Sequence, residues 1–176
     1  MKPLELKIYP EPCLRIKTKP VENFDDDLKE TLQEMADIMY ISNGIGLAAT
    51  QVGLGADILI IDIGEGLKTF INPEIVEISG RKTKMEEGCL SLPGVIVEVA
   101  RPEQVKLRAQ DRKGEAFIKV YDGLMAKVVQ HEMDHLSGKL IIDYLNPFKY
   151  FFTARKLARS KHKSGRISQK EKQHVG

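Results

Sequence analysis

The residues best suited to chemistry lie at positions 130–135, where the sequence reads QHEMDH. His131 and His135 stand four residues apart, so on a helix they project from one face and can bind one metal ion. Glu132 lies about 100° around such a helix from His131. It can therefore reach a metal-bound water without being a ligand. A solvated helix that carries this pattern by chance is the alternative, so the run needs a supporting site elsewhere.

A catalytic metal site needs a third protein ligand and an open position for water. Downstream of His135 the candidates lack a supporting pattern or lie in or near a basic tail: Asp143, His162, Glu171 and His174. Upstream, Cys89 follows a glycine and stands shortly before a proline, in a segment typical of a loop that can approach a ligand. One thiolate and two imidazoles make a plausible tetrahedral set with one vacancy. Cys13 has no such neighbours and is interpreted as a small buried hydrophobic residue.

Residues 44–51 (GIGLAATQ) match the loose glycine fingerprint of dinucleotide-binding proteins. That fingerprint must follow a strand and open a helix, whereas here it follows a predicted helix. The sequence therefore predicts no nucleotide cofactor. Small residues here would instead let the backbone pack closely against the site.

Together, GIGLAATQ (44–51), EGCLS (87–91) and QHEMDHLSG (130–138) resemble the three motifs of the peptide deformylase family, over roughly residues 3–150. The resemblance implies a hydrolase that removes the N-formyl group from the initiating methionine of newly made polypeptides. It also implies that Cys89, His131 and His135 bind the metal. Ferrous iron is the ion that the resemblance favours, with zinc, nickel or cobalt as substitutes, and the spacing does not separate them.

By the same resemblance, Glu132 would be the catalytic acid/base, and Gln51 and the backbone amide of Leu90 would stabilise the oxyanion. Gly46 would lie along the bound peptide. In this chemistry a metal-bound water attacks the formyl carbon, Glu132 takes its proton, and formate leaves after a proton passes to the amine.

A methionine substrate needs an apolar pocket, and helical spacing places candidates for it near the metal. They are Leu124, Val128 and the stem of Lys127, to which Ile45 is added. Ordinary core packing is the equally open alternative for each of them.

The elements that must position these residues follow from periodicity. Apolar residues at three- and four-residue spacing predict a helix over 24–42, capped by an aspartate among 25–27. A second helix is predicted from Asp122, ending at Gly138, and a third over 148–161. Extended segments are predicted at 57–62, 69–73, 74–78 and 116–120, and 95–99 is expected to pair with 104–109.

Because the strands lie in the middle and helices at the ends, the order predicts an α+β fold. Mixed or antiparallel short strands would pack around a central metal-binding HExxH helix, with an N-terminal and a C-terminal helix added. Residues 1–150 are expected to form the catalytic domain and 151–176 a C-terminal helix with a basic tail.

Charge is distributed unevenly. Residues 1–154 carry 19 basic and 24 acidic residues, a net −5, whereas residues 155–176 carry eight basic residues and one acid, a net +7. Such a tail suits a polyanion or is simply a solvated terminus. The resemblance suggests a C-terminal helix that could dock on the ribosome, where formyl-methionyl nascent peptides emerge.

Composition excludes several classes. With 42% hydrophobic and 30% charged residues the chain is typical of a globular protein. No apolar run approaches the ~20 residues that span a bilayer, and no signal peptide is evident, so no membrane partner and a cytoplasmic location are expected. Three further functions stay open: a general HExxH peptidase, a protein with a structural metal only, and a nucleic-acid-binding module carried by the tail.

Overall fold

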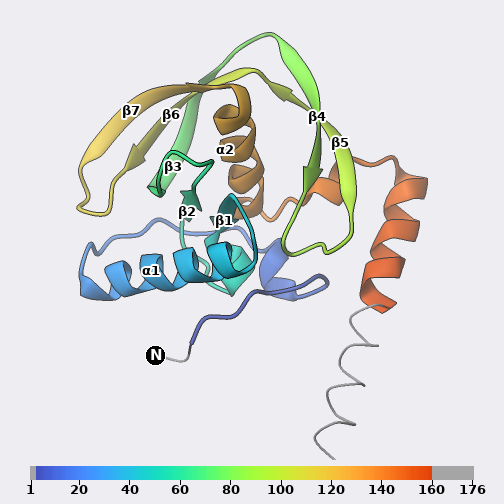
Figure 1. The fold of residues 1–176 in the computed structure, drawn as a ribbon, viewed down its shortest axis with the longest axis horizontal. Helices are drawn as coiled ribbons and strands as arrows, with labels where there is room; N and C mark the ends of the chain where they lie inside the picture. Colours follow the sequence, from blue (N-terminus) through green and yellow to red (C-terminus); the bar gives the residue numbers. More distant parts are fainter. Residues whose placement is uncertain (1–2, 160–176) are drawn as a thin grey trace, which may run out of the picture.

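The computed structural model describes residues 3–159, which form two antiparallel sheets and three α-helices (Figure 1). A five-stranded sheet has the order β1-β2-β3-β6-β7, and a separate two-stranded sheet pairs β4 with β5. The strands are β1 (Gly46–Ala48), β2 (Ile58–Ile61), β3 (Lys68–Ile78), β4 (Lys82–Gly88), β5 (Ile96–Pro102), β6 (Gln104–Gln110) and β7 (Ala116–Asp122). The helices are α1 (Asp26–Ile41), α2 (Gly123–Leu136) and a C-terminal helix over 147–159, and short 3-10 helices cover Pro12–Arg15, Ala49–Val52 and Ile141–Tyr144.

The large sheet is covered on both faces, which explains the continuous apolar run of β2. Leu59 and Ile61 pack with α2 in one core cluster. Ile58 and Ile60 point to the other face and pack with α1. Successive side chains of a strand alternate between faces, so a strand buried on both sides needs apolar residues throughout.

Helix α1 forms where the sequence predicts it. The Asp25 side chain accepts a hydrogen bond from the Leu28 backbone N–H at 3.1 Å, as an N-cap should. The apolar stripe is buried, and it consists of Leu28, Leu32, Met35, Ala36 and Met39. The end of α2 also matches the expectation, because Gly138 has a φ of +73° just beyond the helix.

Two predictions about strands are wrong. Residues 95–99 do not pair with 104–109: β5 pairs with β4, whereas β6 lies between β3 and β7 in the other sheet. The two expected pieces 69–73 and 74–78 form one strand, β3, whose register against β6 shifts between Ile71 and Glu74. Asn72, with a φ of +52°, stands at that irregularity, which is why the pattern breaks there.

A third core cluster lies beneath the β4–β5 hairpin and the C-terminal helix. Val97 and Val99 of β5 pack there with Leu157 of that helix, and Cys13 is partly buried against the same cluster. Helix α2 itself runs between the two sheets and packs against strands of both (Figure 1). Among residues 3–159, no helix is long and apolar enough to cross a membrane.

Candidate active site

Three potential metal ligands meet where α2 passes the β4–β5 hairpin. Cys89 follows β4 directly, and His131 and His135 lie one turn apart on α2. Their ligand atoms all lie within 4.8 Å of one another, and Cys89 Sγ is 3.3 Å from His135 Nε2. A tetrahedral ion with ordinary metal–sulfur and metal–nitrogen bonds would separate such donors by about 3.5 Å. The donor set therefore fits a single ion.

His131 is oriented by a buried carboxylate. Its Nδ1 lies 2.8 Å from Glu87 Oε2, so Nδ1 donates its proton there and the Nε2 lone pair is left for the cluster. Burial lowers the pKa of His131, but hydrogen bonds with Cys89 and Glu87 outweigh this and raise the pKa to about 10. A metal ion binds Nε2 of the neutral imidazole, so it would displace the Nε2 proton of a charged ring and leave the Nδ1 proton on the Glu87 side.

Glu132 lies next to these donors and is 3% exposed. Among the described residues, its Oε2 atom is buried without a hydrogen-bond partner. Burial raises the pKa of Glu132 to about 7. A buried polar atom without a partner is rare in folded proteins and indicates a place for a water, an ion or a substrate.

Gly46 is what allows Glu132 to lie here. A Cβ atom at position 46 would collide with Glu132 Oε1 and lie 2.9 Å from Val128 Cγ1. A side chain at position 46 would displace the carboxylate, so the observed position of Glu132 against β1 requires glycine there. The sequence indicates only a tightly packed backbone here, and the structure identifies the residues it packs against.

Gln51 is buried and turned toward Cys89. Its Oε1 accepts a hydrogen bond from the Ala48 backbone N–H at 2.9 Å, which fixes the amide orientation. Its Nε2 donates to Ser91 Oγ at 3.2 Å and lies 3.6 Å from Cys89 Sγ. Leu90, next to Cys89, lines the same cleft. The structure therefore brings Gln51 and Leu90 together with the three potential ligands.

The cleft over this cluster has a volume of about 640 Å³. The predicted pocket residues Ile45, Leu124, Val128 and Lys127 all line it, together with His131 and Glu132. Ile45 and Leu124 are each 45% exposed, which separates them from ordinary core. Val128, 6% exposed, belongs to both the core and the cleft.

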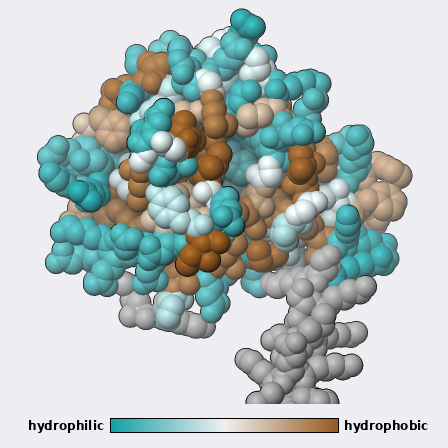
Figure 2. Space-filling model, in the orientation of Figure 1, coloured by the Kyte–Doolittle hydropathy of each residue, from teal (hydrophilic) through white to brown (hydrophobic). Residues whose placement is uncertain are grey.

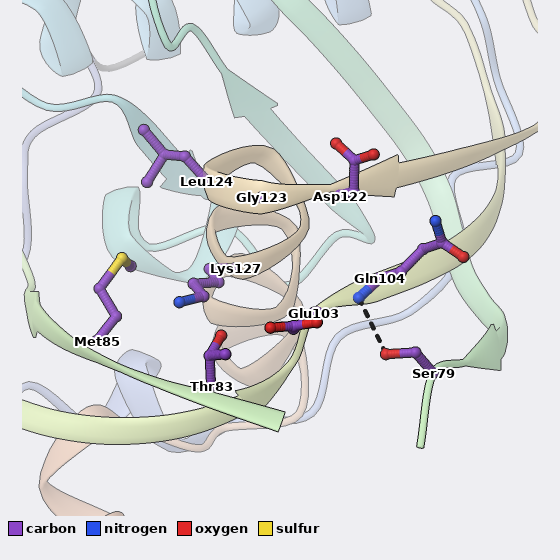
Figure 3. A pocket seen from close by; sticks show the side chains of 9 residues that line it. All are labelled: Ser79, Thr83, Met85, Glu103, Gln104, Asp122, Gly123, Leu124 and Lys127. Carbon is purple, nitrogen blue, oxygen red and sulfur yellow. Dashed lines mark hydrogen bonds between the residues drawn. The ribbon is translucent and has the colours of Figure 1, made fainter. Parts of the chain in front are cut away.

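A second cavity of about 520 Å³ opens on the other side of the first turns of α2 (Figure 3). Met85, Leu124 and Lys127 line both cavities, so these three side chains separate them. The rest of the lining is mainly polar, and within it the Gln104 backbone N–H donates to Ser79 Oγ at 3.2 Å. No potential ligand of the metal cluster lines this cavity.

A buried network that sequence reasoning missed holds Glu87 in place. Arg101 donates to both Glu87 oxygens, at 2.6 and 2.9 Å, and to Asp134 Oδ2 at 2.9 Å. The Tyr144 hydroxyl donates to Asp134 at 2.7 Å. Burial opposes ionisation of Glu87, but hydrogen bonds from His131 and Arg101 outweigh it and lower the pKa. Glu87 and Asp134 lie inside the motifs, yet nothing in their spacing points to Arg101.

Comparisons with known proteins agree on one family. The family model described as polypeptide deformylase matches residues 3–150. A peptide deformylase of Thermotoga petrophila is 44% identical over 152 residues, covering 86% of this chain and 93% of the relative. Peptide deformylase 1 of Burkholderia multivorans is 45% identical over 149 residues, covering 83% and 82%. The crystal structure of a peptide deformylase from Legionella pneumophila superposes with a TM-score of 0.86 at 40% identity, covering 93% of this chain and 98% of that one.

Proposed function

This chain belongs to the polypeptide deformylase family, enzymes that remove the N-formyl group from nascent peptides, and from that premise we propose how its cleft performs the reaction. The observation that carries the proposal is the buried, unpartnered Oε2 of Glu132, beside three potential metal ligands. The methionine would enter the cleft with its formyl group between them.

The family is metal-dependent, and we propose that Cys89, His131 and His135 hold the ion. These are three donors in the described part of the chain, one fewer than a closed structural site needs, which favours a catalytic role. When bound, the ion would polarise the formyl carbonyl and lower the pKa of a water to ~7. We propose ferrous iron as the resident ion, and the same thiolate and imidazole donors accept zinc, nickel or cobalt.

Glu132 would act as the general acid/base. Its carboxylate takes a proton from the attacking water and later delivers a proton to the departing amine nitrogen, which releases formate. The absence of a side chain at Gly46 leaves room for this carboxylate. Burial keeps bulk water away from the proton that Glu132 carries.

Gln51 and Leu90 would stabilise the negative charge that develops on the formyl oxygen. Ala48 fixes the orientation of the Gln51 amide, and Ser91 Oγ takes one Nε2 hydrogen, so the second, on the side of Cys89, would donate to the formyl oxygen. The backbone N–H of Leu90 would be the second donor. One donor of this kind is typically worth ~3 kcal/mol of transition-state stabilisation.

Substrate choice would depend on the apolar part of the cleft. We propose that Ile45, Leu124, Val128 and the stem of Lys127 surround the methionine side chain. Gly46 begins β1, an edge strand of the large sheet, so its backbone can lie along an extended peptide.

The domain division at residue 150 and the ribosome contact stay predictions. Five of the eight basic residues of the tail fall on residues 160–176, outside the described residues. If the tail binds ribosomes, cosedimentation should weaken with added salt and be lost in a chain that ends at residue 159. A cytoplasmic location is part of the same proposal.

The decisive experiment measures formate release from a formyl-methionyl peptide with protein purified anaerobically. Wild type and Glu132→Ala are compared, and bound metal is quantified in both. Activity that is lost in the variant while metal is retained supports the reaction and the role of Glu132. A fully metallated wild type that releases no formate would overturn the proposal, and cleavage of internal peptide bonds would then favour a general HExxH peptidase.

A further inference from the structure

The C-terminal helix exposes three phenylalanine rings. Phe148, Phe151 and Phe152 are 72%, 55% and 54% exposed, although the same helix buries Leu157 in the third core cluster. The rings of Phe148 and Phe152 lie 4.7 Å apart, so they form one continuous apolar surface. Figure 2 shows apolar surface over this helix and over the neighbouring β4–β5 hairpin. Clustered exposed aromatic residues indicate a binding surface more often than scattered ones do.

Phe148 and Phe152 form one side of a groove of about 450 Å³, and residues at the start of β5 form the other. Val95 and Ile96 line both this groove and the catalytic cleft. Ile96 is 68% exposed. Val95 and Ile96 therefore stand between the cleft and the groove, and a chain that leaves the cleft over Ile96 reaches the groove beside the C-terminal helix.

We propose that this groove binds apolar side chains of the polypeptide substrate, downstream of the first three residues. The inference rests on the proposed function, because the substrate's formylated end must lie in the cleft. A polypeptide leaving the cleft over Ile96 meets the two phenylalanine rings next. The lining of the groove carries one carboxylate, Glu98, and one ammonium, Lys149, and its other side chains are uncharged. With no excess of either charge, it suits an uncharged segment.

Binding at the groove has a distinct kinetic signature. Contacts far from the formyl group are equal in the ground state and the transition state, so they lower KM and leave kcat unchanged. Burying an apolar side chain against the two rings, after the entropy of ordering the chain, should change KM by roughly five-fold.

The test compares wild type with Phe148→Ser, Phe152→Ser and a matched control, Phe151→Ser. Phe151 lies on the same helix and is as exposed as Phe152, but it does not line the groove. The substrates are a formyl-methionyl tripeptide and two heptapeptides, which carry either leucine or serine at positions 4–6. In wild type and Phe151→Ser, the leucine heptapeptide should have the lower KM by roughly five-fold. In Phe148→Ser and Phe152→Ser the two heptapeptides should have equal KM.

Tripeptide kinetics should be the same in all four proteins, which shows that the variants are folded. An equal KM for both heptapeptides in wild type would overturn the proposal, as would a preference for leucine that persists in Phe148→Ser and Phe152→Ser. Sedimentation identifies another occupant: if those variants dissociate a dimer without changing peptide preference, a second copy covers the groove and the inference is wrong. Absence of formate release from the tripeptide contradicts the proposed function instead, and fluorescence anisotropy of the labelled heptapeptides then still tests the groove.

Discussion

Glu87 and Glu132 are two buried carboxylates near the same histidine, and their surroundings are opposite. Glu87 is 5% exposed, and both of its oxygens are bonded, to Arg101 and to His131. Glu132 is 3% exposed, and within residues 3–159 its Oε2 has no partner. The two carboxylates are therefore equally buried, but only Glu87 has hydrogen-bond partners for both oxygens.

The pKa values follow this difference. Hydrogen bonds from His131 and Arg101 overcome burial and lower the pKa of Glu87, whereas burial dominates at Glu132 and raises its pKa to about 7. A satisfied buried charge fixes the groups around it, whereas an unsatisfied one costs stability and marks a place for a water, an ion or a substrate. The comparison teaches that Glu87 is held against His131 by its own partners, whereas Glu132 has an oxygen left without one, as the proposed proton transfer requires.

Replacing Arg101 should cause the largest loss in the free energy of unfolding, because Arg101 binds Glu87. Arg101→Met leaves Glu87 buried and Asp134 partly buried without their guanidinium partner, and breaking a buried pair such as Arg101–Glu87 typically costs about 3–5 kcal/mol. Urea unfolding of metal-loaded protein, at constant free metal, measures the loss. Arg108→Met is the control, because its pair with Glu74 is exposed and should matter by less than about 1 kcal/mol. Equal losses in the two variants would show that the buried network does not hold the hairpin to α2.

The second largest effect is expected on metal affinity, when Glu87 is replaced. Glu87→Gln removes the negative charge that accepts the His131 Nδ1–H, and loss of such a partner typically costs 10- to 100-fold in metal affinity. Competition with a chromophoric chelator for Zn²⁺ measures it. The control is Glu86→Gln, its exposed neighbour on β4, which should bind Zn²⁺ as wild type does. An unchanged affinity in Glu87→Gln would remove the positioning role assigned to this residue.

A side chain at Gly46 tests the other carboxylate by steric means. Gly46→Ala forces Glu132 and Val128 to shift, because the new Cβ collides with Glu132 Oε1. A misplaced catalytic group should lower kcat by about ten-fold. Gly80→Ala, where a Cβ meets nothing within 4 Å, is the control for formate release and should be as active as wild type. Full activity in Gly46→Ala would mean that the position of Glu132 is not critical.

The sequence was sufficient to predict those elements whose signals lie within the element itself. The cap at Asp25 and the apolar stripe predict α1, and the apolar run predicts β2. Strand β4 was not predicted because Met85 is its only apolar side chain, so the strand has no apolar alternation. The predicted partner of β5 was wrong because its actual partner, β4, gave no strand signal in the sequence.

The residues of the site also fall into two groups, those that the sequence predicts and those that it does not. Two histidines four apart indicate a metal, the loop context singles out Cys89, and the motif resemblance adds Gln51; the structure places these side chains together. Arg101 could not be predicted, because its partners lie 14 and 33 residues away and meet only in the folded chain. The residues that carry chemistry are thus marked by type and spacing, whereas those that hold them are marked only by tertiary contacts.

The smallest change in the free energy of unfolding is expected at Glu132, and it tests the contrast between the two carboxylates. Glu132→Gln keeps the volume of the side chain and removes a buried charge that has no partner, so the free energy of unfolding should stay within about 1 kcal/mol of wild type. Glu87→Gln, which leaves Arg101 with a weaker partner, should lose more in the same urea titration. Formate release should nevertheless collapse in Glu132→Gln, because an amide cannot carry the proton. If both variants lost stability equally, Glu132 would be held by its surroundings as firmly as Glu87, and its lack of a partner could no longer be interpreted as preparation for proton transfer.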